Sequence, residues 1–302
     1  MRIEQTASTP EDDLKNQPVI RSLRVLSSGW GEQHREHRYG SLKPRLWWAL
    51  TSRSWVKVPI NYFLIEHRDG PLLFDTGLDP AIVSDPQYIN SAIGRFLMKR
   101  IFRLHLSEDD GLDKLLAKAG VSPHAIGCAV ISHLHFDHVG GIRHIPQAEL
   151  LVSEREWAQL SEPHPEREWV LKEHIERPEA KWTPFVFSPS NDPLFEGFAG
   201  TYDVAGDGSM ILIPTPGHTP GSTSMLIRRN GWAPILLVAD LAYEATLIEK
   251  NIVPGTGDKQ ALLSSYTKVR LLKERLPDLV VITSHDFSAA EAISRAIGKE
   301  TA

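Results

Sequence analysis

Short apolar runs, broken by glycine, proline and acidic residues, fill the chain from about residue 18 onward. The segment INYFLIEHRDGPLLFDTG, residues 60–77, has two such runs around a polar turn at residues 68–70, which predicts two paired strands. A short apolar run bounded by turn residues is typical of a buried strand. We therefore expect further strands at residues 128–132, 148–160 (a strand that runs into a helix), 209–215, 222–240 (a hairpin around residues 230–231) and 278–284.

Two helices are predicted by their end signals and periodicity. Residues 107–120, SEDDGLDKLLAKAG, begin with Ser107 as a candidate cap and acidic residues in the first turn, and Gly120 follows the last turn. The other helix is expected at residues 259–275. Because strands and helices are mixed and hairpins occur in both halves, the order favours an α/β (α+β) fold with mixed sheets between layers of helices.

The domain organisation follows from the absence of any segment with the composition of a linker. We expect a flexible polar tail at residues 1–18 and a single domain at residues 19–302. Residues 161–198 show little clear periodicity, and we expect loop insertions there and near residues 40–58 and 85–106.

Composition narrows the class of protein. The chain has 302 residues, 41% of them hydrophobic, and a formal net charge of −5, so we expect a substantial core and no global attraction to nucleic acid or acidic membranes. The single cysteine, Cys128, rules out an intrachain disulfide and fits a reducing compartment. No apolar stretch of about 18 residues is present, and the N-terminal segment lacks a signal-peptide core. We expect a cytoplasmic protein without stable membrane insertion.

The segment ISHLHFDHVGG, residues 131–141, concentrates ligand-type side chains directly after an apolar run. Imidazoles and carboxylates are good ligands for zinc and similar divalent ions. Alternation after a strand would aim His133, His135 and Asp137 into one cavity, and His138 elsewhere. The spacing therefore favours two neighbouring metals, the first two histidines on one and Asp137 and His138 on the other. The alternative is a polar turn that happens to be rich in histidine.

Three more ligand-type residues follow apolar strands further along the chain. His218 lies in the turn TPGHTPGS, Asp240 ends the run PILLVAD, and His285 follows DLVVITS. Each alone would be an ordinary loop residue. Together with the first cluster they make seven ligands, about the number that two metals with open positions need.

These motifs resemble the metal-binding signature of the metallo-β-lactamase superfamily, from residue 59 to residue 285. The resemblance implies an αββα four-layer sandwich with a dinuclear site at one edge of its sheets. It implies one metal held by His133, His135 and His218, another held by Asp137, His138 and His285, and Asp240 as the bridge.

The substrate class depends on Tyr243, three residues after Asp240 in ADLAYE. This arrangement resembles the N-acyl homoserine lactonases of the superfamily, in which a tyrosine at the matching position contacts the substrate carbonyl. The alternative for Tyr243 is a half-buried aromatic residue near the site. The commonest subclass of zinc β-lactamases uses a cysteine ligand late in the chain. Here the only cysteine, Cys128, precedes the motif on a strand where we expect a packing role, which argues against that subclass.

The expected reaction is hydrolysis of an acylated lactone. Two cations that share a water lower its pKa enough to supply hydroxide near neutral pH, and this hydroxide would attack the carbonyl carbon. Tyr243 would stabilise the oxyanion, and Asp137 would carry the proton to the leaving alkoxide. Zinc, manganese, iron and cobalt all suit these ligands, with zinc favoured. A thioesterase of the glyoxalase II type, a β-lactamase, an aryl-ester or phosphoester hydrolase, and a non-catalytic metal-binding scaffold remain alternatives.

Two further features have open roles. Asp75, in LLFDTG, would either orient a ligand histidine or cap the following turn. The aromatic segments at residues 43–59 and 94–106 would line an acyl pocket or form a lid, or else pack in the core or in a homodimer surface.

Overall fold

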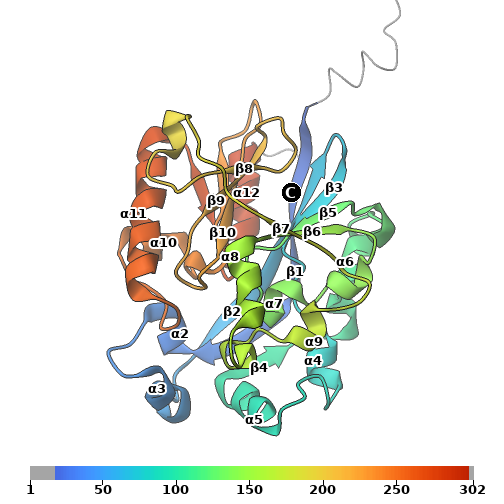
Figure 1. Cartoon of the computed structure of the whole chain (residues 1–302), viewed down its shortest axis with the longest axis vertical. Helices are drawn as coiled ribbons and strands as arrows, with labels where there is room; N and C mark the ends of the chain where they lie inside the picture. The colour runs from blue at the N-terminus through green and yellow to red at the C-terminus, as the bar shows by residue number, and fades with distance from the viewer. Residues whose placement is uncertain (1–17, 299–302) are drawn as a thin grey trace, which may run out of the picture.

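Two mixed β-sheets form the centre of the protein, as seen in a computed structural model that describes residues 18–298 (Figure 1). The first sheet has seven strands in the order β4-β1-β2-β3-β5-β6-β7. Its strands are β1 (Ile20–His34), β2 (Trp55–His67), β3 (Gly70–Phe74), β4 (Phe102–His105), β5 (Cys128–Val130), β6 (Glu149–Ser153) and β7 (Lys181–Phe185). The pairs among β1 to β4 are antiparallel, whereas β3, β5, β6 and β7 pair in parallel.

The second sheet has five strands in the order β12-β11-β10-β9-β8. Its strands are β8 (Tyr202–Asp203), β9 (Met210–Pro214), β10 (Thr223–Ile227), β11 (Ile235–Leu237) and β12 (Val280–Ile282). Only β11 and β12 pair in parallel, and the long helix between them makes that crossover.

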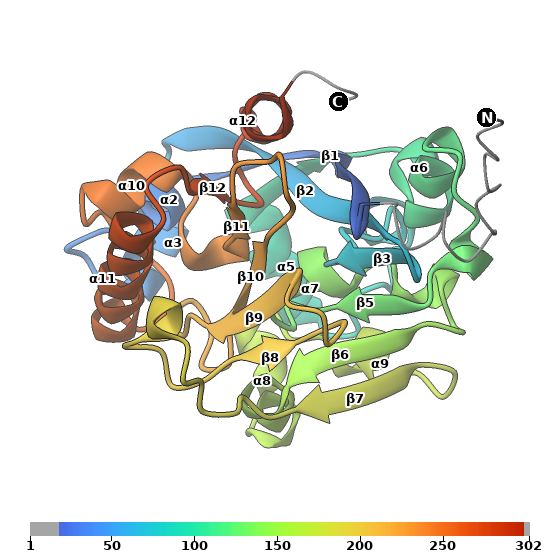
Figure 2. The same cartoon turned by 90° about the horizontal axis from the view of Figure 1, so that it is seen from above.

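Some of the helices cover the outer faces of the two sheets, whereas the last helix of the chain packs against the cluster between the sheets. The bounds of the helices are α2 (Arg35–Tyr39), α3 (Arg45–Thr51), α4 (Ala81–Ser84), α5 (Ala92–Ile101), α6 (Leu112–Lys118), α7 (Phe136–Val139), α8 (Glu154–Trp157), α9 (Lys172–Ile175), α10 (Ala245–Glu249), α11 (Lys259–Arg275) and α12 (Ala289–Ile297). Figure 2 shows α10 and α11 outside the second sheet and α6 and α9 outside the first. None of the helices in residues 18–298 is long and apolar enough to cross a membrane.

The core has one layer between the sheets and one on each outer face. Between the sheets, Phe63 and Phe74 of the first sheet share a buried cluster with Leu212 and Met225 of the second. A second cluster joins the first sheet to α6, and a third joins the second sheet to α11. These layers confirm the predicted αββα sandwich.

The local predictions were confirmed at several places and wrong at others. The strand pair at residues 60–77 turns between His67 and Gly70, and α11 has the predicted bounds. The helix expected over residues 107–120 is divided: Ser107 caps a short 3-10 turn, and α6 begins only after Gly111. The predicted tail, apart from residue 18, lies outside the described residues.

The three segments expected as loop insertions contain regular structure. Residues 40–58 include α3 and the start of β2, residues 85–106 include α5 and β4, and residues 161–198 include α9 and β7. Strand β7 was missed because it is an edge strand with Pro184 in it, and only Phe185 of its five residues is buried. Half-buried edge strands lack the apolar run that identifies a central strand.

Candidate metal centre

All seven predicted ligands meet at one edge of the sandwich. His133 and His135 follow β5, and α7 continues with Asp137 and His138. His218 follows β9, Asp240 follows β11, and His285 follows β12. Because these strands end at the same edge, side chains from both sheets converge there. The ligand atoms form two groups of neighbours, the first of His133, His135 and His218, the second of Asp137, His138, Asp240 and His285.

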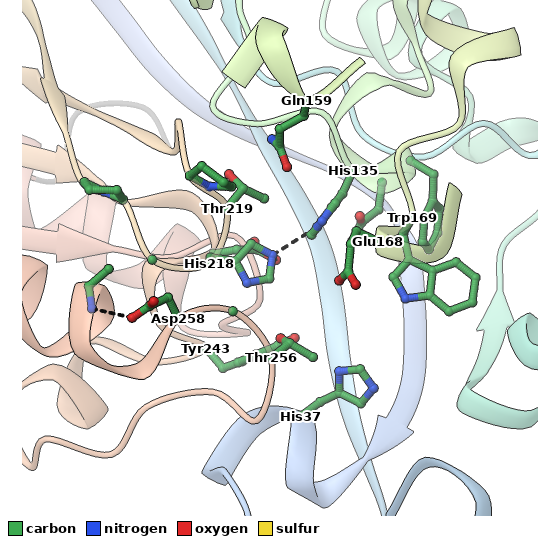
Figure 3. Close-up of a pocket in the computed structure, with 18 of the residues that line it drawn as sticks. His37, His135, Gln159, Glu168, Trp169, His218, Thr219, Tyr243, Thr256 and Asp258 are labelled. Atoms are coloured by element: carbon green, nitrogen blue, oxygen red, sulfur yellow. Dashed lines mark hydrogen bonds and ion pairs between the residues drawn. The ribbon is translucent and has the colours of Figure 1, made fainter. Parts of the chain in front are cut away.

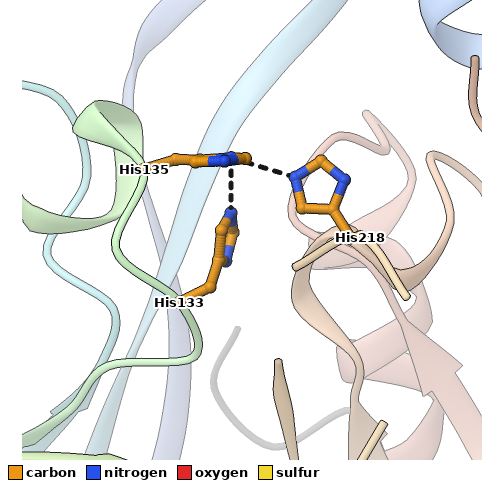
Figure 4. A group of neighbouring side chains, drawn as sticks. All are labelled: His133, His135 and His218. Atoms are coloured by element: carbon orange, nitrogen blue, oxygen red, sulfur yellow. Dashed lines mark hydrogen bonds between the residues drawn. The ribbon is translucent and has the colours of Figure 1, made fainter. Parts of the chain in front are cut away.

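The first group consists of three imidazoles with their nitrogens turned toward one another (Figure 4). Nδ1 of His135 lies 3.1 Å from Nε2 of His133 and 3.0 Å from Nε2 of His218. Burial lowers the pKa of His135 and of His218 to about 3, so these rings are neutral at neutral pH. Neutral rings offer lone pairs, which is the form that binds a metal.

The second group places Asp240 between two histidines. Its Oδ1 lies 3.2 Å from Nε2 of His138, and its Oδ2 lies 3.0 Å from Nε2 of His285. Asp137 Oδ2 lies 3.6 Å from the same His285 nitrogen. Asp240 Oδ2 is also 3.4 Å from Nε2 of His218, so this carboxylate touches both groups. Asp240 therefore lies between the two groups, where a ligand shared by two metals is expected.

The charge balance of the second group differs from that of the first. Burial lowers the pKa of His138, but the carboxylates of Asp240, Asp75 and Asp137 outweigh it and the pKa is raised well above its ordinary value. The same balance with Asp240 raises the pKa of His285. The acidic groups therefore favour positive charge at this position, which a bound cation would supply.

Unpaired polar atoms test whether divalent cations fit here. His138 Nε2 and Asp240 Oδ1 are buried and lie 3.2 Å apart, but neither makes a hydrogen bond within residues 18–298. Buried polar atoms are nearly always hydrogen-bonded, so this facing pair without a hydrogen bond is a place where a cation between the two atoms would satisfy both. Nitrogen and oxygen donors in this number suit two divalent ions with a position left open. The donor set therefore fits a dinuclear centre.

Asp75 forms a hydrogen bond with a histidine of the second group on the side away from the other ligands. Its Oδ2 accepts a hydrogen bond from His138 Nδ1 at 2.8 Å and another from the Ser132 hydroxyl, and its Oδ1 accepts the Ser132 amide. Of the two roles considered for Asp75, orienting a ligand histidine is the one its contacts support. His285 is fixed similarly, since its Nδ1 lies 2.8 Å from the carbonyl oxygen of Pro59.

Glu156 joins the two loops that carry the first group. This fully buried carboxylate on α8 accepts hydrogen bonds from the amide of Leu134, between His133 and His135, and from the hydroxyl of Thr219, next to His218. It also accepts the amide of Gly221. Glu156 was not identified from the sequence, because the segment SEREW has the pattern of an ordinary helix start.

A cavity of about 380 Å³ opens over the ligands. Tyr243 lines it, and the phenol ring stacks on His285 with ring centres 5.1 Å apart. The Tyr243 hydroxyl donates to Oε1 of Gln33 at 3.3 Å. Burial, with the charge of Asp240, raises the pKa of Tyr243 well above its ordinary value, so the phenol keeps its proton.

The remaining cavity wall combines aromatic and polar side chains (Figure 3). Phe102, Phe136 and Trp169 contact one another edge to face on the aromatic side. An ion pair of Arg45 with Glu168 lies among the lining residues, with its two N–O distances at 2.5 and 2.7 Å. The segments at residues 43–59 and 94–106 therefore each provide lining residues.

Other aromatic residues of these segments lie elsewhere. Trp48 is buried and packs edge to face on His37, whereas Trp47 is 59% exposed. Cys128 is half-buried against the core between the sheets. Gln33 and His37 were not identified from the sequence as site residues, because nothing in their local patterns distinguishes them from core positions.

Comparison with known proteins places the chain in a family. Residues 55–285 match the Metallo-beta-lactamase superfamily. The N-acyl homoserine lactonase AttM of Azorhizobium caulinodans is 28% identical over 248 residues, which cover 80% of this chain and 87% of that protein. An N-acyl homoserine lactonase of Bacillus sp is 31% identical over 246 residues, covering 79% and 86%.

Solved structures agree at the level of the fold. An N-acyl homoserine lactone hydrolase with the product N-hexanoyl-L-homoserine at its catalytic metal centre superposes with a TM-score of 0.73 at 22% identity, covering 91% of this chain and 96% of that chain. The dizinc quorum-quenching lactonase AidC gives a TM-score of 0.56 at 20% identity, covering 87% and 86%. With its sandwich fold, its seven candidate ligands at one sheet edge and a match over most of its length, this chain belongs to the metallo-beta-lactamase superfamily.

Proposed function

We propose that this protein hydrolyses the ring ester of N-acyl homoserine lactones. The observation that carries the proposal is the position of Tyr243, which lines the same cavity as the ligand cluster and stacks on His285. A buried phenol that keeps its proton is a suitable donor to a carbonyl oxygen, and less suited to a phosphoryl group that needs positive charge. The lactonase names of the sequence relatives support the same substrate class.

The seven ligands would hold two divalent cations, and we propose zinc. His133, His135 and His218 would hold one and Asp137, His138 and His285 the other, with Asp240 shared. Bound cations would supply the positive charge that lowers the pKa of a water and polarises the ester carbonyl.

The chain's own residues orient the reaction. The substrate carbonyl oxygen would lie beside the Tyr243 hydroxyl, whose proton stabilises the negative charge that develops during attack by water. Asp137 is 17% exposed at its side chain and faces the same cavity, so it can accept the proton of the attacking water and return it to the leaving alkoxide. The aromatic side of Phe102, Phe136 and Trp169 would seat the acyl chain.

The test is turnover of a substrate panel after reconstitution with metal. The panel contains short- and long-chain acyl homoserine lactones, a simple γ-lactone, S-lactoylglutathione, a chromogenic cephalosporin and a phosphodiester. We expect metal-dependent preference for the acylated lactones, and loss of both activity and bound metal in His135→Ala. Activity confined to another panel member would refute the lactone assignment while leaving the hydrolytic site in place.

Tyr243→Phe separates the carbonyl role from metal binding. Removal of one oxyanion donor should lower kcat by about 100-fold while two metals remain bound. Lactone turnover at the wild-type rate in this variant would remove the main support for a carbonyl substrate.

A further inference from the structure

Gln33 is a buried glutamine near the end of β1, and its amide faces the catalytic cavity. The residue is only 4% exposed, it lines the cavity, and its backbone is paired with Val56 of β2 and Phe102 of β4. A buried amide is unfavourable unless its hydrogen bonds are made. Oε1 accepts the Tyr243 hydroxyl at 3.3 Å, whereas Nε2 has no partner within residues 18–298. Half of this buried amide is therefore unsatisfied.

The direction of this hydrogen bond matters for Tyr243. A phenol has one proton, and when Gln33 Oε1 accepts it, that proton is directed at the wall and not at a substrate. The oxygen and nitrogen of a carboxamide are nearly equal in shape, so a half-turn of the amide exchanges them without disturbing the packing. After the half-turn, Nε2 lies beside the phenol oxygen and donates to it. The Tyr243 proton is then free to point into the cavity.

We propose that Gln33 is a positioning residue of the reaction: its Nε2–H donates to the phenol oxygen of Tyr243, and the phenol O–H then donates to the carbonyl oxygen of the ester. This inference rests on the proposed function. The two hydrogen bonds form a chain in which the first strengthens the second as negative charge develops on the substrate oxygen. The half-turn also gives Nε2 a partner and leaves Oε1 without a donor. A buried acceptor without a partner is less rare in proteins than a buried N–H donor without one.

In this proposal Gln33 sets the direction of the Tyr243 hydroxyl proton, whereas other contacts hold the Tyr243 ring in position. Tyr243 is held by its stacking on His285 and by a hydrogen bond from the Thr283 hydroxyl to its carbonyl oxygen at 3.1 Å. Loss of the Gln33 amide should therefore leave the ring and the metal ligands where they are. This separation makes the role testable by kinetics.

The experiment is a double-mutant cycle on the metal-reconstituted enzyme with N-hexanoyl homoserine lactone. Gln33→Met keeps the volume and removes the amide, and we expect kcat to fall about tenfold with a smaller change in KM. Tyr243→Phe should lower kcat by about 100-fold. In the double variant kcat should stay within about twofold of Tyr243→Phe alone, because Gln33 has no phenol left to orient.

Two controls distinguish positioning from a structural effect. Gln147→Met makes the same substitution at a glutamine outside the cavity, whose Nε2 donates to the carbonyls of Pro123 and Ile126, and should leave kcat unchanged. Metal content and circular dichroism of Gln33→Met should equal those of the wild type.

The outcomes separate this inference from the proposed function. If Gln33→Met keeps the wild-type kcat, loses metal, or multiplies its effect with Tyr243→Phe, the inference is overturned although the enzyme is a lactonase. If the wild type ignores lactones but hydrolyses another carbonyl ester of the panel, the proposed substrate is wrong, and the same cycle on that ester tests Gln33. An enzyme inactive on every carbonyl ester overturns both.

Discussion

Asp75 illustrates how single residues support the site. Its backbone has φ of 62°, a left-handed conformation that residues other than glycine seldom adopt. In this conformation the carboxylate reaches both the Ser132 amide, at 2.7 Å, and Nδ1 of His138, at 2.8 Å. Acceptance of the Nδ1 proton leaves Nε2 of His138 free to bind a metal. The local strain is therefore offset by the hydrogen bonds that select the ligand form of the histidine.

Asp75→Asn should weaken metal binding in the second group. The amide nitrogen of asparagine can donate to Nδ1 of His138, which would move the ring proton to Nε2 and block that ligand atom. We expect affinity for the second metal to fall by about 10- to 100-fold. Competition with a chromogenic chelator measures it, and Asp109→Asn, on an exposed turn, is the control. Unchanged affinity would show that Asp75 does not set the tautomer.

Cys128 should behave as a structural thiol. Burial raises its pKa to about 12 from the ordinary value of 9.0. The folded state therefore holds the thiol proton more tightly than the unfolded state, and stability should fall as pH rises from about 9 toward 12. Alkylation by iodoacetamide at pH 8.5 should be at least about 100-fold slower in native buffer than in denaturant, because the thiolate is the reactive form. Equal rates in the two conditions would contradict this placement.

Short elements carry the ligands, and their docking decides the geometry of the site. Helix α7, which holds Asp137 and His138, has only four residues and is fixed by contacts with the loop after β3. The Thr76 amide donates to the carbonyl of His138, and the Gly140 amide donates to the carbonyl of Gly77. A Cβ at Gly140 would overlap the backbone of Leu78 and Asp79, so glycine is required by the close approach. Tertiary contacts, and not helix propensity, stabilise such a short helix.

Helix α8 holds two ligand loops together through Glu156, and Glu156→Gln should loosen both. The amide can replace only one carboxylate oxygen as an acceptor, so at least one of the donors at Leu134, Thr219 and Gly221 loses its partner. We expect a loss of about 1–3 kcal/mol in the free energy of unfolding and weaker binding of the first metal.

Chemical denaturation and metal titration measure these two effects. Glu154→Gln, at an exposed position of the same helix, is the matched control and should change neither quantity. Wild-type metal affinity in Glu156→Gln would limit the role of Glu156 to the stability of the fold.

At the scale of the whole molecule, the candidate metal site lies where the two sheets and their loops meet, so we expect metal binding and folding to be linked. Asp240, His138 and His285 are buried, and Asp240 contacts both histidines. Because these donors come from strands far apart in sequence, the unfolded chain cannot assemble them. A ligand that binds only the folded state raises its stability.

Chelation should therefore lower the melting temperature. At a free metal concentration of about 100 times Kd, each bound metal adds about 2.7 kcal/mol, which its removal withdraws. Differential scanning calorimetry with and without EDTA measures the change. In His135→Ala the EDTA-dependent shift should be smaller, since one site is already impaired. A wild-type melting temperature that EDTA leaves unchanged would contradict this coupling.

The sequence by itself predicted the sandwich and the seven candidate ligand positions, which the fold brings to one edge. Apolar runs mark the central strands because those strands are buried on both faces, and ligand-type residues placed at strand ends need only the strands to bring them together. The ligand-type residues of the motif at residues 131–141 are close in sequence, so their clustering could be predicted without a structure. The same physical rule failed at the edge strand β7 and in α3 and α5, whose burial is partial.

Only the tertiary structure decided what surrounds the ligands. Gln33 contacts Tyr243 across 210 residues of sequence, and Glu156 contacts Thr219 across 63. Neither contact leaves a local pattern, since a buried glutamine on a strand and a glutamate in a first helical turn are ordinary in sequence. Ligand types are a property of the residues themselves, whereas their partners, burial and unpaired atoms are set by long-range packing. Long-range packing depends on which distant segments become neighbours in the fold, and the sequence alone does not show that.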